Sequence, residues 1–241
     1  MQLPILKELV PSGFSYGGSY IVEFQPDSLW YGTSLTIAAH ASMEGMPTDY
    51  HTYQQNPHEI REALTRLGVD VQKLEKDGTL RILDSYNLQT RLGSTEIPEK
   101  SQLAQDFYQS LSVSERSIGA AQEIKAAPEI EKKRLHIDDN TSVLLQYNQE
   151  KAVIDFWRVR HTPRTRALGL VFVPAILVGV HSEPFYKQFE SLHDGIIDLK
   201  SEQKGEEIEH YIRVRIMRGK PYNSRWHRLT VRDGGEVTLS E

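Results

Sequence analysis

Apolar residues along the chain come in short runs that alternate with amphipathic stretches. Short runs bounded by turn residues predict strands, whereas apolar residues that recur every three or four positions predict helices. We expect strands at residues 20–22, 48–53, 80–83, 134–139, 167–180, 195–199, 209–217, 225–231 and 236–239. Strands that alternate with helices and then give way to hairpins predict an α/β domain with a mainly parallel sheet, helices on both faces and an antiparallel edge.

Helices are expected where polar and apolar positions follow the helical period. Asn56, Pro57 and Glu59 form a helix-start signal, and the helix that follows is expected to stop at Gly68 in a left-handed conformation. A small-residue stretch around Leu35 predicts a helix after the first strand. Further helices are expected at residues 99–111, 114–125 and 141–160, and we treat residues 1–241 as one domain.

The order strand, tight loop, helix at residues 20–45 is the context of a phosphate-binding loop, GxxxxGK[ST]. The loop there reads Asp27-Ser28-Leu29-Trp30-Tyr31-Gly32-Thr33-Ser34 and is called the altered loop below. It keeps the second glycine and the hydroxyl, but Asp27 replaces the first glycine and Thr33 replaces the lysine. Bulky residues cannot approach a polyphosphate as small ones do, and an aspartate repels it. The outline is that of a degenerate Walker A motif.

The order of these pieces resembles the KaiC/RadA group of RecA-like ATPases, above all the single-domain KaiC-like proteins of archaea. The resemblance rests on these segments in sequence: PSGFSYGGSYIVEF, GTSLTIAAHASMEG, HEIREALTRLGVDVQKLEKDGTLRILDSY, RLHIDDNT, AILVGVHSEP, ESLHDGIIDL and RVRIMRGKPYNSRWHRLTVRDGGEVTL. It implies a RecA-like P-loop fold, with ATP at the carboxyl ends of the parallel strands and often between the subunits of a ring.

Three departures from the family pattern fall on groups that would face a triphosphate. Thr33 stands in place of the lysine, and Gln54-Gln55 stand in place of a Glu-Glu pair that supplies the general base. Ile216-Met217-Arg218 keeps only the arginine of a Lys-x-Arg finger. Phosphoryl transfer depends almost entirely on positioning and electrostatics, so these losses predict a pseudo-ATPase with no nucleotide cofactor.

Two of the resemblance's ligand positions are retained. Asp138 matches the carboxylate that orients a magnesium-bound water, and Ser34 matches the hydroxyl ligand. Asp138 and Asp139 also have the ordinary interpretation of turn or cap residues. The first alternative function is therefore a slow ATPase or nucleotide switch that binds Mg-ATP through Ser34, Asp138 and Arg218, with a lysine such as Lys151 or Lys220 supplied from elsewhere.

Partner contacts form the other set of hypotheses. Trp30 and Tyr31 either fill the vacated phosphate position or form an exposed knob for a partner. A cluster of arginines surrounds Thr162-Pro163: Arg158, Arg160, Arg164 and Arg166. Contacts of these arginines with a phosphate backbone suggest a second alternative function, a single-stranded DNA-binding recombinase accessory protein. Their ordinary interpretation is that of positive charges at the end of a helix. The favoured role is assembly with itself or with RecA/KaiC-like paralogues, in DNA repair or signalling.

Composition narrows these hypotheses further. The net charge of −5 gives no bulk attraction to nucleic acid or to a membrane surface. The chain has no cysteine, which excludes disulfides and thiolate metal sites. The first residues lack a charged segment followed by a long apolar one, so no signal peptide is expected. We expect a soluble, cytoplasmic protein without a membrane partner.

Overall fold

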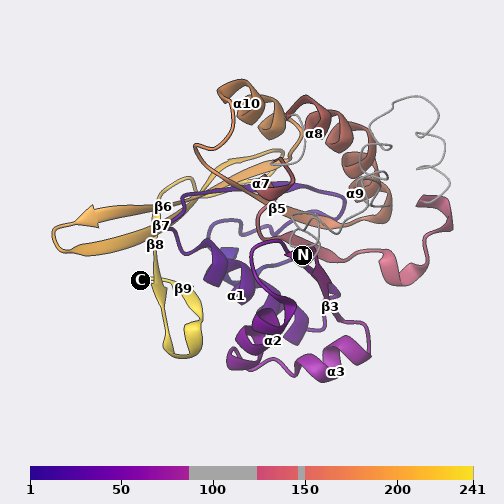
Figure 1. The fold of residues 1–241 in the computed structure, drawn as a ribbon, viewed down its shortest axis with the longest axis horizontal. Helices are drawn as coiled ribbons and strands as arrows, with labels where there is room; N and C mark the ends of the chain where they lie inside the picture. Colours follow the sequence, from indigo (N-terminus) through magenta and orange to yellow (C-terminus); the bar gives the residue numbers. More distant parts are fainter. Residues whose placement is uncertain (87–123, 146–149, 241) are drawn as a thin grey trace, which may run out of the picture.

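The computed structural model describes residues 1–86, 124–145 and 150–240 (Figure 1). Within these ranges nine strands form a single sheet, in the order β3-β2-β4-β5-β1-β6-β7-β8-β9. The strands are β1 (Tyr20–Phe24), β2 (Thr48–Thr52), β3 (Leu80–Asp84), β4 (Leu135–Asp138), β5 (Val171–Leu177), β6 (Gly195–Lys204), β7 (Glu207–Met217), β8 (His227–Val231) and β9 (Val237–Leu239).

The first six strands of this order run parallel, and the pairs β6–β7, β7–β8 and β8–β9 are antiparallel. The predicted mainly parallel sheet with antiparallel C-terminal strands is therefore confirmed. One helical segment, η1 (Pro4–Leu6), precedes β1, and the others described lie between strands: α1 (Trp30–Met43), α2 (Pro57–Arg66), α3 (Val71–Lys76), η2 (Glu129–Glu131), α7 (Ser142–Leu145), α8 (Glu150–Phe156), the π-helix η3 (Trp157–His161), α9 (Thr162–Leu168), α10 (Glu183–Ser191) and η4 (Asp233–Gly235).

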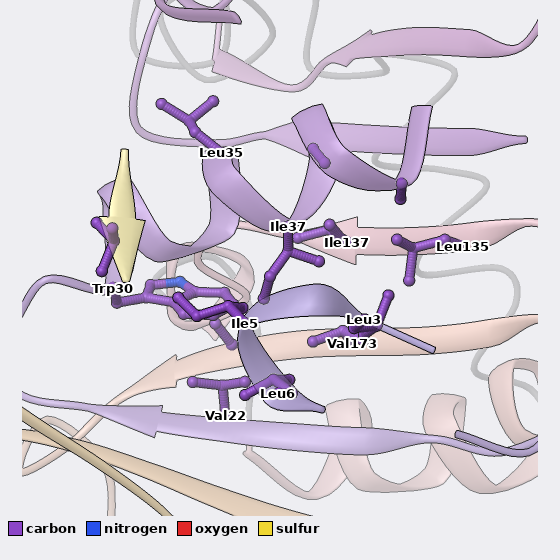
Figure 2. Close-up of a cluster of buried hydrophobic side chains, with 14 of the residues drawn as sticks. Leu3, Ile5, Leu6, Val22, Trp30, Leu35, Ile37, Leu135, Ile137 and Val173 are labelled. Atoms are coloured by element: carbon purple, nitrogen blue, oxygen red, sulfur yellow. The ribbon is translucent and has the colours of Figure 1, made fainter. Parts of the chain in front are cut away.

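Two apolar clusters lie on opposite faces of the sheet. The larger cluster packs α1, α2 and the N-terminal segment against side chains such as Val22, Ile137 and Val173 (Figure 2). The smaller one packs α8, η3 and α10 against Ile21 and Phe172 on the other face. Neighbouring strand residues alternate between these clusters because successive side chains of a strand point to opposite faces. This alternation fixes which face each polar residue of β2 and β4 occupies.

Local signals place α2 as the sequence predicts. Asn56 accepts from the His58 backbone N–H at 2.9 Å, and Glu59 accepts from the Asn56 backbone N–H at 3.1 Å, which completes a capping box. Gly68 has φ 86°, the left-handed conformation expected after the helix end. Among the described residues, no helix is both long enough and apolar enough to cross a membrane.

The region around Pro163 differs from the prediction. The expected helix was to end at Arg160, but helical structure continues through η3 and α9 to Leu168, and Gly169 caps it with φ 65°. Proline lacks the N–H that an α-helix interior needs, and the π-helical turn before Pro163 absorbs the mismatch. Strand β5 consequently begins at Val171 rather than at 167.

Smaller differences concern the strand ends. The strand expected at 195–199 continues to Lys204 and pairs with a β7 that begins at Glu207, so the two form a long hairpin that projects from the sheet (Figure 1). The expected helix at 99–111 lies outside the described residues, as does 114–125 apart from its last two positions.

Candidate functional site

The altered loop lies where β1 ends and α1 begins, at the carboxyl edge of the parallel strands. Helix α1 starts at Trp30, whose indole is 2% exposed and belongs to the larger apolar cluster with Val22 and Ile5 (Figure 2). The indole N–H donates to the backbone carbonyl of Asp139, at the end of β4, across 2.7 Å. Trp30 therefore bridges α1 to β4, and it offers no exposed knob to a partner.

The two hydroxyl residues of the loop are turned into the protein. Thr33 and Ser34 are fully buried. The Thr33 hydroxyl donates to the Leu29 carbonyl at 2.7 Å, and the Ser34 hydroxyl donates to the Tyr31 carbonyl at 2.8 Å. Ser34 Oγ also lies 2.9 Å from the buried Tyr50 hydroxyl. Neither hydroxyl projects toward solvent.

Gly32, the retained glycine of the loop, has a packing role. A Cβ added there would lie 2.9 Å from Val237 Cγ2 on β9, closer than real Cβ contacts. Strand β9, which pairs with β8, is also joined to α1 by a hydrogen bond: the Val237 backbone N–H donates to the Thr36 hydroxyl at 3.0 Å. Contact with β9 is thus sufficient to explain a glycine at this position. Asp27, by contrast, is exposed.

The end of β2 completes the polar network. The Tyr31 hydroxyl donates to Gln55 Oε1, whereas Gln54 is exposed. Burial raises the pKa of Tyr31 to about 12, so the hydroxyl stays protonated and remains a donor. Gln55 thus serves as the acceptor for an aromatic residue of the altered loop.

Asp139 is the carboxylate that faces this network. It is 1% exposed, and its carboxylate oxygens accept from the Tyr53 backbone N–H at 2.8 Å and from the Thr52 hydroxyl at 3.2 Å. Burial raises its pKa to about 6, with the neighbouring Asp138 adding a smaller upward effect. Sequence reasoning did not single out Asp139, Tyr50 or Tyr53 as neighbours of the loop.

Asp138 lies on the other face of the sheet. Ile137 packs in the α1 cluster, so His136 and Asp138 point away from α1. Asp138 Oδ1 lies 3.1 Å from His136 Nε2 and 3.3 Å from His51 Nδ1. The structure therefore separates Ser34 and Asp138, the two residues that the sequence suggested as magnesium ligands, by the thickness of the sheet.

The comparisons with known proteins agree with this architecture. The family model described as "ATPase: KaiC" matches residues 33–241, most of the chain. The chain belongs to the KaiC ATPase family. A crystal structure of a KaiC-like protein from the hyperthermophilic archaeon Pyrococcus horikoshii OT3 is similar, with a TM-score of 0.69 at 18% identity, over 100% of this chain and 98% of that one. No curated protein gives a significant match.

In this KaiC-family chain, Arg218 lies far from the altered loop along the strands. It follows Met217, which pairs with Gly195, and Gly195 in turn pairs with Tyr20 at the start of β1. Arg218 is thus at the amino edge of the parallel strands, whereas the altered loop is at the carboxyl edge. Its side chain is exposed, and it donates to the Ser191 carbonyl at 3.4 Å.

The two lysines considered as substitutes for Thr33 are engaged elsewhere. Lys220 Nζ donates to the Gly13 carbonyl at 2.6 Å. Lys151 forms an ion pair with Asp155, one turn away on α8. Neither contact joins the lysine to the altered loop.

The arginine cluster of the KaiC-family chain lies on helical structure rather than in a loop. Arg158 and Arg160 are part of η3, and Arg164 and Arg166 are part of α9. Arg158 lies 3.8 Å from Asp155, and Arg164 lies 3.8 Å from Glu131. At least two members of the cluster therefore have acidic neighbours within the chain.

Proposed function

We propose that this KaiC-family protein is a pseudo-ATPase whose phosphate position is filled by its own side chains and which acts through assembly. The observation that carries the proposal is the bridge from Trp30 to the Asp139 carbonyl, 2.7 Å long and buried. A phosphate cradle needs small residues and free N–H groups at the start of the helix. Here an indole occupies that start and ties it to β4.

Electrostatics support the same proposal. The altered loop has an exposed aspartate, Asp27, and a threonine in the lysine position whose hydroxyl is committed to Leu29. The acceptor opposite the loop is the amide of Gln55, which cannot take a proton from an attacking water. A triphosphate there would meet one negative charge and no lysine from the loop. Binding energy and general-base catalysis are both expected to be lost.

The slow-ATPase alternative is less well supported. It needs Ser34 and Asp138 to share a magnesium ion, yet they occupy opposite faces of the sheet. It also needs a substitute lysine, and both named candidates have other partners.

Assembly is the role that remains for such a domain, because a RecA-like fold keeps packing surfaces when its pocket is lost. Apolar side chains exposed on the described surface are suited to such contacts, among them Val178 and Val180 after β5 and Ile208, Ile216 and Val231 on β7 and β8. We propose homo-oligomers or mixed oligomers with active paralogues, serving DNA repair or signalling.

The test is calorimetric titration with Mg-ATP of the wild-type chain, a Thr33→Lys variant and a Trp30→Gly/Thr33→Lys double variant. Wild type and Thr33→Lys are expected to give no binding heat at millimolar nucleotide, because the lysine alone does not vacate the position of the indole. Circular dichroism establishes that each variant is folded. Micromolar binding by wild type, about −8 kcal/mol, would show the proposal to be wrong.

Assembly is measured separately by light scattering on a sizing column. For the chain alone, a mass of two or more times 27.6 kDa is expected. If the chain assembles only with a catalytically active KaiC-like paralogue, the mixture is expected to contain a complex heavier than either protein gives alone. A monomer in both arms would remove the assembly part of the proposal and leave the calorimetric part unaffected.

A further inference from the structure

Three potential metal ligands converge on the face of the sheet that lies away from α1. His51 on β2 stands opposite Asp138 on β4 in the strand register, and His136 is two residues before Asp138 on the same face. One ligand atom from each residue lies within 4.8 Å of the other two. The neighbouring strands β2 and β4 thus hold two imidazole nitrogens and a carboxylate oxygen around one point.

We propose that this triad is a binding site for a divalent transition metal ion of the zinc class. Two imidazoles and one carboxylate form a donor set used for Zn²⁺ and other first-row ions, with at least one position left for water. His136 Nε2 and His51 Nδ1 both face Asp138 Oδ1, at 3.1 and 3.3 Å. A zinc ion needs ligand distances of about 2 Å, so small side-chain rotations are sufficient to receive it.

The outer nitrogens of both histidines already have partners. His51 Nε2 lies 2.5 Å from the Ser85 hydroxyl, and His136 Nδ1 lies 3.6 Å from Asp49 Oδ2. Metal-binding histidines characteristically have their second nitrogen oriented in this way, by a carboxylate or another oxygen. Asp49 is itself held by Arg134, whose Nε donates to it at 2.8 Å. The imidazoles are therefore oriented by groups outside the triad.

The site combines burial with access. The Asp138 side chain is 2% exposed, whereas those of His136 and His51 are 14% and 24% exposed. A cavity of about 150 Å³ reaches His136, and it is also lined by the carboxylates of Asp49 and Glu131 and by the guanidinium groups of Arg81 and Arg164, which pair with them. His136 is therefore reached from a polar cavity whose lining carries charges of both signs. The Tyr53 hydroxyl, 3.2 Å from His51 Nδ1, is placed to contact a water on the ion.

This inference does not depend on the proposed function, because the triad lies on the opposite face of the sheet from the altered loop. Its competitor is a purely structural role, in which Asp138 only accepts hydrogen bonds from the two imidazoles. That role predicts no preference for a metal ion, and the two are separable by direct binding.

The experiment is calorimetric titration of chelator-treated full-length protein with ZnCl₂, for wild type, His51→Gln, His136→Gln and a His58→Gln control. His58 is an exposed histidine on α2 whose side chain is 76% accessible and 3.8 Å from Glu62. Wild type and His58→Gln are expected to bind one ion per chain with equal affinity. Each triad variant is expected to lose that site, and Co²⁺ binding is expected to give the visible absorption of a low-symmetry site in wild type only.

Ser85→Ala guards against variants that fail to fold, since it leaves all three proposed ligands in place and removes a hydroxyl that contacts His51. It is expected to weaken zinc binding about 10–100-fold, the usual effect of removing a group that orients a ligand. Zinc affinity that is unchanged in His51→Gln and His136→Gln would overturn the proposal, as would wild-type binding no tighter than that of the triad variants.

Discussion

Trp30 offers the most direct test of how the altered loop is built. Its side chain is 2% exposed, and a buried tryptophan removes about 200 Å² from water, which at about 25 cal/mol/Å² gives about 5 kcal/mol. Trp30→Ala is therefore expected to lower the free energy of unfolding by about 3–5 kcal/mol. Trp30→Phe keeps most of the apolar contact but removes the donor to the Asp139 carbonyl, so about 1–3 kcal/mol is expected.

The assay is urea unfolding followed by far-ultraviolet circular dichroism at constant pH. Trp226→Ala is the matched control, because that ring is only partly buried and its described cationic contacts are Lys200 at 4.2 Å and Arg213 at 4.4 Å. Its loss is expected to cost about 1 kcal/mol. The reasoning would be refuted if Trp30→Ala cost no more than Trp226→Ala, since the indole could not then be the buried bridge between α1 and β4.

Three further predictions concern packing and charge. Gly32→Ala is expected to destabilise the chain by about 1–3 kcal/mol, because its Cβ would lie 2.9 Å from Val237 Cγ2. In urea unfolding, adding Val237→Ala to Gly32→Ala is expected to recover part of that loss. Strictly additive effects of the two substitutions on the free energy of unfolding would disprove the contact. The pKa of Asp139 is raised to about 6 in the folded protein from 3.8, so its contribution to stability declines as pH rises through that window. The asparagine of Asp139→Asn would not titrate, so the free energy of unfolding of this variant relative to that of wild type should rise by about 3 kcal/mol between about pH 4 and pH 7.5 in urea unfolding. A difference between the two proteins that stays constant over this pH range would count against the raised pKa. Burial lowers the pKa of His193 to about 3 from 6.5, so stability is lost as pH falls below 6.5. Below this pH, the free energy of unfolding should fall less steeply for His193→Gln than for wild type, with a difference in slope of about 1.4 kcal/mol per pH unit. Equal slopes would contradict a buried neutral imidazole.

The sequence was sufficient for the sheet and for the family, because both depend on the order of strands and turns. The sequence also identified Asp138 at the end of β4, but it grouped the Asp138 side chain with Ser34, which lies on the opposite face of the sheet. Alternation along β4 puts Ile137 toward α1 and Asp138 away from it. That alternation is visible in the sequence, but which face carries α1 is decided by packing between distant segments.

The His51–Asp138 pairing shows a second limit. The segment TDYHTY gives no metal-ligand spacing on its own, and only the register of β2 against β4 brings His51 beside Asp138. Register depends on partners far apart in the chain, which a single sequence does not specify. The helix through Pro163 was missed for a different reason: a proline normally predicts a helix end, and the π-helical turn that accommodates it has no reliable sequence signature.

The long hairpin of β6 and β7 has a consequence for solubility. Strand β1 pairs with β6 only as far as Leu199, and among the described residues no other strand covers the outer part of β6 on that side. The Ser201 backbone N–H donates to the Gln25 side chain there, and the rest of the edge could pair with a β-strand of another molecule. Charged side chains follow one another around the outer part of the hairpin: Lys200, Glu202 and Lys204 on β6, Glu206 in the turn, and Glu207 and Glu209 on β7. Like charges of a second copy, aligned in the same register, would repel one another. The projecting hairpin thus carries its own protection against fibrous self-association.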